Sequence, residues 1–320
     1  MILAAGLGTR LRPLTRLRPK VLVPVMGVPV LDFWVRRLHR EGFQGVVVNA
    51  FHLARRLRDH VREKSWPLPV EVVEEARLLD TGGGIRNVLD FFRGRPFLVV
   101  NGDILCNAPL RSLYEEYLHA GVPAAMLLDH CPRFNNVAVD AEGRVSGFGS
   151  AARTLAAGNA RIRLRAFTGI QFLRPDLFKD LPKGEPCGIL AIHDELIRKK
   201  EPVKALTVPD LIWEETGTLS SYLEAHRRMA SLSRGVLEPL PTGRSVLVHP
   251  AARVAPDALL KDLVVVGENA RVGKGAVLQN VVLWDGATVR SGRHLEECVV
   301  ADGLIVHPHS DRVPTGTSIK

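Results

Sequence analysis

Residues 3–15 read LAAGLGTRLRPLT, and their pattern is the most informative in the chain. An apolar lead-in that is too short for a helix runs into Gly6 and Gly8, and two arginines, Arg10 and Arg12, follow. Glycine allows the backbone to approach an anion with its amides turned inward, and guanidinium groups supply fixed charge suited to phosphate oxygens. The stretch therefore predicts a strand followed by an anion-binding turn.

Two well-known phosphate-binding loops do not account for this stretch. The Rossmann dinucleotide fingerprint needs a third glycine, and the chain has Leu11 at that position. The Walker loop needs lysine and then serine or threonine directly after its second glycine, and Thr9 and Arg10 follow instead. The turn is therefore of another kind.

Outward from this turn, short apolar runs alternate with helical patterns. The expected strands are 1–5, 45–50, 70–75, 97–101 and 123–128, and the expected helices are 31–42, 52–64, 84–93 and 110–120. Nearly continuous apolar strands separated by helices predict an α/β fold, a Rossmann-like and mostly parallel sheet flanked by helices. Ligands of such sheets bind at the carboxyl ends of the strands, where the glycine turn and the NGD segment, 101–103, both fall.

From about residue 245 the pattern changes to an aliphatic residue at every sixth position. The aliphatic residues are Val248, Val254, Leu260, Val266, Val272 and Leu278, and, after a one-residue slip, Leu283, Val289 and Leu295. This period excludes an amphipathic helix and is typical of a parallel β-helix, with an ordinary β-meander as the alternative. Gly267 and Gly273 follow their aliphatics as a tight corner requires. The run resembles the left-handed hexapeptide-repeat proteins, and its open coil ends predict a homo-oligomer.

The composition excludes several classes of protein. Of the 320 residues, 46% are apolar, yet no apolar run approaches the roughly 18 residues that span a bilayer. The four cysteines are scattered without a CxxC pair, and no secretory signal pattern is present. We therefore expect a cytoplasmic protein with no membrane partner.

The net charge of +9 raises the question of a nucleic-acid partner. In the segment HLARRLRDHVREK, 52–64, the apolar Leu53, Leu57 and Val61 recur every four residues and the charges take the other faces. Solvated helix faces explain the basic balance, and no nucleic acid is expected as a partner.

The glycine stretch, followed by RPKVLVPVMGVPVL at 18–31, resembles the signature of the nucleotide-sugar pyrophosphorylases, also called sugar-1-phosphate nucleotidyltransferases. The resemblance covers about 1–230. It implies that a sugar 1-phosphate attacks the α-phosphorus of a nucleoside triphosphate, that pyrophosphate leaves, and that a nucleotide sugar forms. The expected domains are a nucleotidyltransferase domain over 1–235, a linker over 236–245 and the β-helix over 246–320.

The resemblance also implies roles for single residues. Arg10, Lys20 and Asp103 are the implied catalytic residues, with Arg10 on the triphosphate and Lys20 on the α-phosphate. Catalysis of phosphoryl transfer is mostly positioning and charge neutralisation, which suits these cations. The implied nucleotide-binding residues are Leu3, Ala4, Ala5, Gly6, Gly8, Thr9, Arg10, Lys20, Thr81, Gly82 and Gly83.

The implied cofactor is Mg²⁺, held by oxygen ligands. Asp103 follows a buried strand and resembles the family's metal-binding aspartate, although a turn-forming role is its alternative. The second metal ligand of the family is an aspartate, and the segment WEETGTL, 213–219, has Glu215 in that position. Glutamate binds Mg²⁺ but reaches one methylene farther.

The nucleobase and the sugar are less clearly specified. The segment TGGGI, 81–85, packs against the base in the family, and its glycines leave room for a flat ring. Its form resembles the N-acetylmuramate 1-phosphate uridylyltransferases, whereas hexapeptide tails are commoner among mannose-1-phosphate guanylyltransferases. UTP is therefore expected ahead of GTP, and both stay open.

The sugar-binding residues implied by the resemblance are Asn101, Asn136, Thr168 and Gly169. The family's lysine after a GRV hairpin is missing here. Arg153, Arg163 and Arg165 are candidates for the missing charge, with an ordinary surface position as the favoured alternative for each. The missing lysine and Glu215 also leave an alternative function open. In that alternative the chain is a catalytically inactive regulatory or scaffold subunit that binds a nucleotide sugar.

Overall fold

The computed structural model describes residues 1–308 and consists of two compact units. The first unit contains residues 1–6 and 38–213, and the second contains residues 7–37 and the chain from residue 214 onward. The expected β-helix domain runs to residue 320, so its last part, 309–320, lies outside the described residues.

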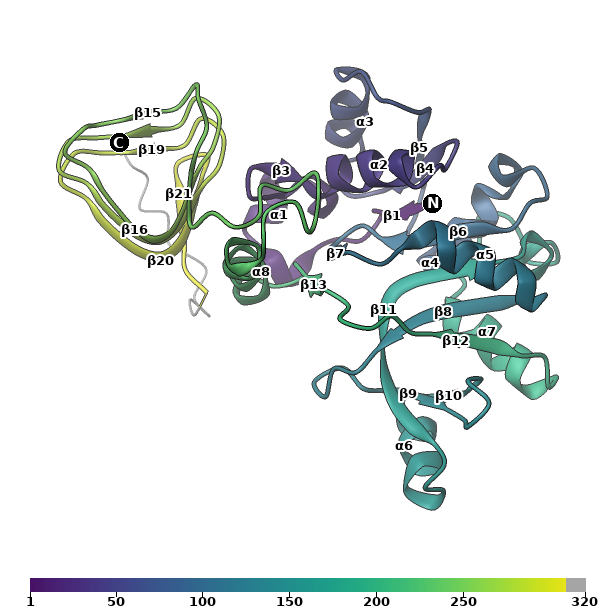
Figure 1. The fold of residues 1–320 in the computed structure, drawn as a ribbon. Helices are drawn as coiled ribbons and strands as arrows, with labels where there is room; N and C mark the ends of the chain where they lie inside the picture. Colours follow the sequence, from purple (N-terminus) through teal and green to yellow (C-terminus); the bar gives the residue numbers. More distant parts are fainter. Residues whose placement is uncertain (309–320) are drawn as a thin grey trace. The chain divides into compact units, whose positions relative to one another are not determined.

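The first unit is built on a sheet with the order β10-β9-β11-β6-β1-β4-β5, and β8 pairs with both β11 and β12 (Figure 1). Its strands are β1 (Ile2–Leu3), β4 (Val46–Ala50), β5 (Val70–Glu74), β6 (Phe97–Asn101), β8 (Ala124–Asp129), β9 (Val137–Val139), β10 (Val145–Phe148), β11 (Arg163–Leu173) and β12 (Val203–Leu206). The strands expected from the sequence are confirmed as β1, β4, β5, β6 and β8.

The sheet is mixed, which corrects the expectation of a mostly parallel one. β1, β4, β5 and β6 pair in parallel, and so do β8 and β12. β11 instead runs antiparallel to β6, β8 and β9. Its residues from Thr168 to Leu173 are buried. β11 was not among the strands expected from the sequence, so the sequence analysis did not include its antiparallel pairings.

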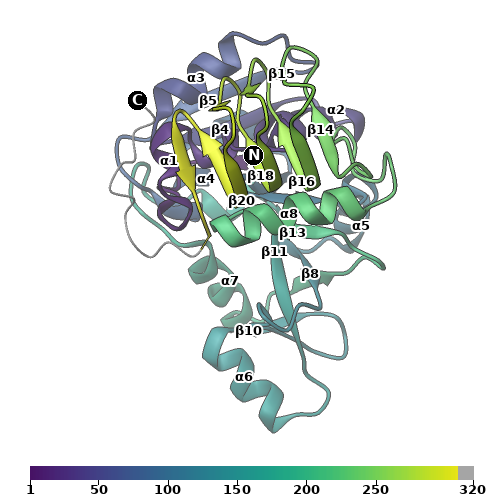
Figure 2. The same cartoon turned by 90° about the vertical axis from the view of Figure 1, so that its left-hand side faces the viewer.

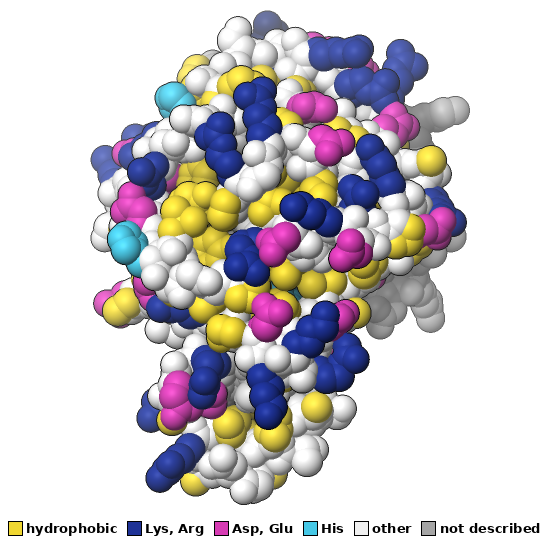
Figure 3. All heavy atoms as spheres, turned by 90° about the vertical axis from the view of Figure 1, so that its right-hand side faces the viewer, with side chains coloured by type: hydrophobic (Ala, Val, Ile, Leu, Met, Phe, Trp, Pro, Cys, Tyr) yellow, Lys and Arg dark blue, Asp and Glu magenta, His cyan; other side chains and the backbone are white. Residues whose placement is uncertain are grey.

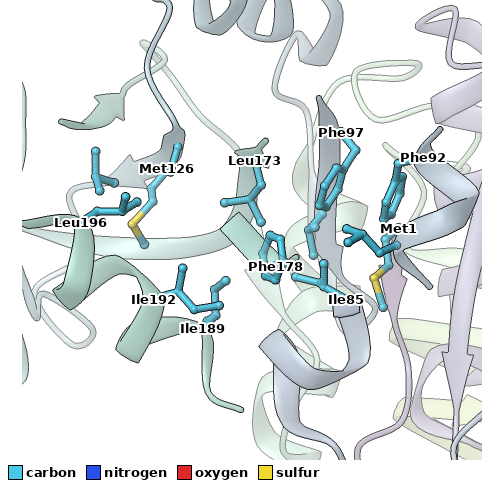
Figure 4. Packing of buried hydrophobic residues seen from close by; sticks show 14 of the residues in the cluster. Met1, Ile85, Phe92, Phe97, Met126, Leu173, Phe178, Ile189, Ile192 and Leu196 are labelled. Atoms are coloured by element: carbon cyan, nitrogen blue, oxygen red, sulfur yellow. The ribbon is translucent and has the colours of Figure 1, made fainter. Parts of the chain in front are cut away.

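Helices cover both faces of this sheet. On β11, the ring of Phe172 stacks on Tyr117 with centroids 5.7 Å apart, whereas its neighbour Leu173 packs in a cluster with Ile85 and Ile192 (Figure 4). Successive side chains of a strand point to opposite faces. The helix of Tyr117 therefore covers one face, and the helices of Ile85 and Ile192 cover the other.

The helices are α2 (Val30–Arg40), which crosses the border between the units in sequence, α3 (Ala54–Arg62), α4 (Asp80–Asn87), α5 (Leu110–Ala120), α6 (Gly149–Gly158), α7 (Ile189–Arg198), and the 3-10 turns η3 (Leu89–Phe92) and η4 (Pro175–Phe178). The four helices expected from the sequence lie close to α2, α3, α4 with η3, and α5, whereas α6 and α7 were not expected. The helix expected at 84–93 is in fact α4 followed by η3. No helix within residues 1–308 is long and apolar enough to cross a bilayer.

The carboxyl ends of β1, β4 and β6 meet at one edge of the sheet. Leu3 is in register with Asn49 and with Asn101, and the Gly102 N–H donates to the Leu3 carbonyl at 2.9 Å. Residues 4–6 and the NGD turn therefore start from the same edge. This is the edge at which ligands of such sheets bind.

The second unit combines the signature segment with the C-terminal strands. Its first elements are η1 (Thr9–Leu11), α1 (Leu14–Leu17), η2 (Lys20–Leu22), the hairpin of β2 (Pro24–Val25) and β3 (Val28–Pro29), and α8 (Leu219–Ser231). β13 (Trp213–Glu215) crosses the border in sequence. The Thr218 hydroxyl caps α8 by accepting the Ser221 N–H at 3.1 Å, and the Ser221 hydroxyl accepts the Thr218 N–H at 2.9 Å in return.

The C-terminal strands form two sheets, and Figure 2 shows β14, β16, β18 and β20 side by side in the larger one. One has the order β14-β16-β18-β20-β21 and the other β15-β17-β19. The strands are β14 (Val246–Val248), β15 (Arg253–Val254), β16 (Leu259–Val266), β17 (Arg271–Val272), β18 (Val277–Leu283), β19 (Thr288–Val289), β20 (His294–Ala301) and β21 (Leu304–Val306). All pairs are parallel except β20 with β21.

The register of these strands confirms the repeat read from the sequence. Leu260 pairs with Leu278 and Leu278 with Leu295, and the aliphatics pack in one core cluster. Val248, in the first strand, is an exception because it is 38% exposed. We call residues 246–306 the parallel-strand domain.

The reason that glycine is required at positions 267 and 273 differs from the one expected. Neither has a positive φ. A Cβ on Gly267 would lie 2.7 Å from the backbone nitrogen of Asp285, and a Cβ on Gly273 would lie 2.5 Å from that of Ser291. The close approach of the next coil, rather than a tight corner, requires glycine at these two positions.

The segment expected to be a linker, 236–245, is packed within the second unit. Leu237 and Leu240 are buried, and the Gly243 N–H donates to the Met229 carbonyl of α8 at 3.0 Å. The Thr242 hydroxyl donates to the Ser233 carbonyl at 2.7 Å. By contacts, the two compact units divide at 213–214, because α8 contacts both β2 of the signature segment and β16 of the parallel-strand domain.

Candidate functional site

The glycine turn leads from β1 into η1. Gly8 has a φ of 60°, in the left-handed region that favours glycine. A Cβ on Gly8 would also lie 2.7 Å from Cγ2 of Thr15, whose hydroxyl donates to the Gly8 carbonyl at 2.8 Å. At Gly6, by contrast, no described atom lies within 4 Å of the position of a Cβ. Gly8 is thus fixed by local structure, whereas the Cβ position of Gly6 faces open space.

Arg10 and Glu215, which the sequence assigns to the triphosphate and the metal, contact each other within the second unit. Nη2 of Arg10 donates to Oε1 of Glu215 at 2.8 Å. The Arg10 side chain is 62% exposed and the Glu215 side chain 17%. A Cβ on Gly217 would collide with the Glu215 carboxylate, so glycine at 217 allows this orientation of Glu215.

Lys20 begins the short turn η2, directly after Pro19. The Leu22 N–H closes the turn on the Pro19 carbonyl at 2.8 Å, and both Val21 and Leu22 are buried. Lys20 itself is half-buried. The buried neighbours and the closed turn fix the backbone from which the Lys20 side chain extends.

Asp103, Asn101 and Gly169 come from adjacent strands of the first unit. Asp103 lies in the turn between β6 and β7 (Ile104–Cys106) and is half-buried. Gly169 has a φ of 86° at an irregularity in β11, and a Cβ there would lie 2.7 Å from Nδ2 of Asn101. The structure therefore brings Asn101 and Gly169 together beside the turn that carries Asp103.

The remaining sugar-site candidates of the first unit have structural roles of their own. The buried Thr168 hydroxyl donates to the Leu127 carbonyl at 2.8 Å, so its proton is used within the sheet. Asn136 is exposed just before β9, and its N–H donates to the Arg165 carbonyl at 2.9 Å. Nη1 of Arg165 donates to the adjacent backbone carbonyl, whereas the side chains of Arg163 and Arg153 are exposed.

Thr81, Gly82 and Gly83 lie in the first turn of α4, in the first unit. The Gly83 N–H donates to the Cys187 carbonyl at 3.1 Å, and a Cβ on Gly82 would lie 2.9 Å from that oxygen. A Cβ on Gly83 would collide with the carbonyl of Glu185. The Cβ positions of Gly82 and Gly83 thus face backbone of the segment 185–187, which requires glycine at both.

A buried polar pair, Asn49 and Glu75, was missed by the sequence analysis. Both residues are 3% exposed. Oδ1 of Asn49 accepts the Ala4 N–H at 2.9 Å, and Nδ2 of Asn49 donates to Oε1 of Glu75 at 2.7 Å. Oε2 of Glu75 accepts the Leu79 N–H at 3.2 Å. The pair thus links the residues before the glycine turn to the residue before α4.

Burial raises the pKa of Glu75, and the hydrogen bonds from Asn49 and Leu79 oppose that shift. The pair ties together two segments that the sequence assigns to the nucleotide. Its signal in the sequence is a polar residue ending each of two apolar strands, VVVNA and VEVVEE. Such residues are also common at strand ends for reasons of solvation, so the pattern alone did not single them out.

The fold and the turn define the class of the protein: an α/β protein with polar residues gathered at the carboxyl edge of its sheet. Residues 1–231 match the nucleotidyl transferase family, and residues 242–311 match the GMPPB C-terminal domain. The chain belongs to the nucleotidyl transferase family and is an enzyme of the nucleotide-sugar pyrophosphorylase type. Family membership therefore favours the enzyme over the inactive subunit considered from the sequence.

Two curated relatives and one solved structure illustrate the similarity. A mannose-1-phosphate guanylyltransferase of Mycobacterium tuberculosis is 30% identical over 305 residues, which cover 92% of this chain and 82% of the relative. An N-acetylmuramate alpha-1-phosphate uridylyltransferase of Neisseria meningitidis is 33% identical over 231 residues, 70% of this chain and 95% of the relative. The crystal structure of HddC from Yersinia pseudotuberculosis complexed with GMP-PN superposes with a TM-score of 0.58 at 22% identity, covering 71% of this chain and 97% of HddC.

Proposed function

We propose that the chain transfers a nucleoside monophosphate from UTP or GTP to a sugar 1-phosphate, forming a nucleotide sugar and releasing pyrophosphate. The observation that carries this proposal is the family match over residues 1–231, which includes the signature residues Arg10 and Lys20. The alignment with a guanylyltransferase that acts on mannose 1-phosphate supports GTP, and the alignment with an N-acetylmuramate alpha-1-phosphate uridylyltransferase supports UTP.

The proposed reaction is an in-line displacement at the α-phosphorus. An oxygen of the sugar 1-phosphate forms the new bond while the bond to pyrophosphate breaks, and pyrophosphate leaves with the electron pair. Arg10 and Lys20 supply the fixed positive charge that lowers the repulsion between the two anions. The residues proposed to bind the nucleotide around them are Leu3, Ala4, Ala5, Gly6, Gly8, Thr9, Thr81, Gly82 and Gly83.

Asp103 and Glu215 are the proposed ligands of Mg²⁺, which would neutralise phosphate charge when bound. Their carboxylates are the hard oxygen donors that Mg²⁺ prefers. Residues 1–308 contain no group of three metal-ligating side chains. A site of one or two carboxylates completed by substrate phosphates is usual for Mg²⁺ in phosphoryl transfer, so this donor set fits the ion.

Asn101, Asn136, Thr168 and Gly169 are proposed to line the sugar site. The contact between Asn101 and Gly169 beside the Asp103 turn supports this assignment more directly than the exposed position of Asn136. We further propose that the parallel-strand domain is a left-handed β-helix and that the protein is a homo-oligomer. The six-residue repeat and the coil-to-coil register support the first of these proposals.

A pyrophosphate-release assay with four nucleoside triphosphates, several sugar 1-phosphates and Mg²⁺ tests the proposed function. We expect turnover with UTP or GTP. Lys20→Ala and Asp103→Ala should each lower the rate by about a hundredfold, because each removes charge compensation at the reacting phosphates. Absence of turnover for every substrate pair, with nucleotide-sugar binding intact, would contradict the proposal.

A further inference from the structure

The turn that carries Lys20 is connected at both ends to the parallel-strand domain, and all residues involved belong to the second unit. Arg18 lies two residues before Lys20, and Pro24 follows η2. Both ends reach the same short stretch of the parallel-strand domain, at Trp284 and Asp285. No role was assigned to either of these two residues from the sequence.

The first connection is made by the guanidinium of Arg18. Its central carbon lies 5.0 Å from the ring centroid of Trp284, within the range of a cation–π interaction. Its Nη1 donates to Oδ2 of Asp285 at 3.2 Å. The Arg18 side chain is 25% exposed, so the guanidinium is largely shielded between these two partners.

The second connection passes through α8. Nε1 of Trp284 donates to the hydroxyl of Tyr222 at 3.0 Å, and that hydroxyl donates to the Pro24 carbonyl at 2.5 Å. Trp284 and Tyr222 are among the largest fully buried side chains of the described chain. Burial raises the pKa of Tyr222, so its hydroxyl keeps the proton that it donates. Because proline has no N–H, the carbonyl is the one backbone group of Pro24 that can form a hydrogen bond, and it accepts the one from Tyr222.

The carboxylate of Asp285 is itself held in place by the preceding coil. Its Oδ1 accepts the N–H of Glu268 at 3.0 Å, which leaves Oδ2 directed to Arg18. The absence of a side chain at Gly267 makes room for it, because a Cβ there would lie 2.7 Å from Oδ1. The coil therefore presents a pre-oriented carboxylate to the signature segment.

From these contacts we infer that Trp284 and Asp285 are positioning residues for Lys20, so that the parallel-strand domain is part of the catalytic apparatus. The inference rests on the proposed function for the role of Lys20. By fixing Arg18 and Pro24, the domain restricts the motion of the turn between them, and so restricts the backbone that carries the Lys20 side chain. Catalysis by charge neutralisation depends on such placement, and small displacements of a catalytic group are costly.

The test uses the full-length variants Trp284→Phe and Asp285→Asn. The first removes the indole N–H but keeps an aromatic ring, and the second removes the charge but keeps the shape. We expect each to lower kcat of pyrophosphate release about tenfold, with less than a twofold change in KM for the sugar 1-phosphate. Hydrogen exchange of the amides in 18–24, measured by mass spectrometry, should become about tenfold faster.

Glu297→Gln is the matched control. Glu297 on β20 contacts Arg227 on α8, so this variant loosens another contact between α8 and the parallel-strand domain without touching the turn of Lys20. We expect wild-type kcat and wild-type exchange in 18–24. All measurements are made well below the melting temperature of each variant, so that loss of folded protein does not contribute.

Wild-type kcat and exchange in both Trp284→Phe and Asp285→Asn would overturn the inference. An equal loss of kcat in Glu297→Gln would also overturn it, because general docking would then explain the effect. The exchange measurement needs no substrate. If the wild-type protein has no turnover at all, the proposed function fails, whereas unchanged exchange in 18–24 refutes the connection itself.

Discussion

Glu215 forms a hydrogen-bonded ion pair with Arg10, a residue that the proposed function requires for binding the triphosphate. The guanidinium is mostly exposed, so water and salt screen the attraction, and pairs of this kind contribute about 0–1 kcal/mol to stability. A triphosphate with several charges can therefore replace the carboxylate on Arg10 at small cost. The ion pair therefore orients both side chains, and it is weak enough for either side chain to exchange its partner.

Glu215→Gln tests the dual placement of this carboxylate. We expect little change in the free energy of unfolding, a roughly hundredfold lower rate of pyrophosphate release, and a weaker dependence of the rate on Mg²⁺. The measurement is a Mg²⁺ titration of the rate together with urea unfolding. Glu214→Gln is the control, because Glu214 is the adjacent carboxylate and lies 3.8 Å from Arg228 instead. A wild-type Mg²⁺ dependence in Glu215→Gln would rule out Glu215 as a metal ligand.

Removal of the Glu75 carboxylate should disturb the edge of the sheet. Glu75→Ala leaves the Asn49 amide and the Leu79 N–H without their buried acceptor, and we expect a loss of about 2–4 kcal/mol in the free energy of unfolding. Urea unfolding provides the measurement. Glu71→Ala is the matched control on the same strand, where the side chain is exposed and the expected change is within about 0.5 kcal/mol. Equal effects of the two variants would show that the buried pair is unimportant.

At the scale of the element, α4 depends on glycine because other backbone packs against it. In Gly83→Ala the added methyl group meets the carbonyl of Glu185, so backbone has to shift, and we expect a loss of about 1–3 kcal/mol. Gly158→Ala, at the last residue of α6, is the control, since the added group meets nothing within 4 Å beyond its chain neighbours and the backbone of its own helix, and alanine favours a helix by up to about 1 kcal/mol. Thermal and urea unfolding should therefore show a lower free energy of unfolding for Gly83→Ala and a higher one for Gly158→Ala.

The helix α8 contains a histidine that makes stability depend on pH. Burial lowers the pKa of His226 to about 4, and its Nδ1–H donates to the Tyr222 carbonyl at 2.9 Å. The unfolded chain, with a pKa near 6.5, binds more protons between these two values, so stability falls as pH falls from about 6.5 towards 4.

The expected contribution of His226 is a slope of about 1 kcal/mol per pH unit near pH 5. Urea unfolding at pH 7, 6 and 5 measures it. His226→Gln should be less stable than the wild type at pH 7 but lose less stability on acidification. His193, whose pKa burial also lowers to about 4, accounts for a similar slope that persists in this variant. An unchanged slope in His226→Gln would mean that His226 does not titrate on unfolding.

At the scale of the whole molecule, the excess of basic residues does not define a binding surface on the face shown in Figure 3, where Lys and Arg are interspersed with Asp and Glu. We expect binding to a DNA or RNA duplex to be weak, because counterion release needs many phosphates contacted at once. Fluorescence anisotropy at 50 and 200 mM salt measures it. Tight binding that falls steeply with salt would contradict this expectation and favour a nucleic-acid partner.

The sequence predicted many of the helices and strands but few of the contacts between them. The five strands, the helix positions and the six-residue repeat were readable because each depends on local periodicity. β11 was not among the expected strands, and its antiparallel pairing was not readable because the strands that it pairs with are distant in sequence. The Asn49–Glu75 pair and the Glu185 carbonyl against Gly83 were hidden for a related reason: their partners are distant in sequence and leave no local pattern.

The sequence by itself determined the family signature, the glycine turn with its cations, and the α/β and repeat character of the two regions. Only the tertiary structure decided that Arg10 pairs with Glu215, that the supposed linker is packed, and that Trp284 and Asp285 hold the segment of Lys20. The physical reason is range: propensity and periodicity act over a few residues, whereas hydrogen bonds and packing join whichever residues the fold brings together.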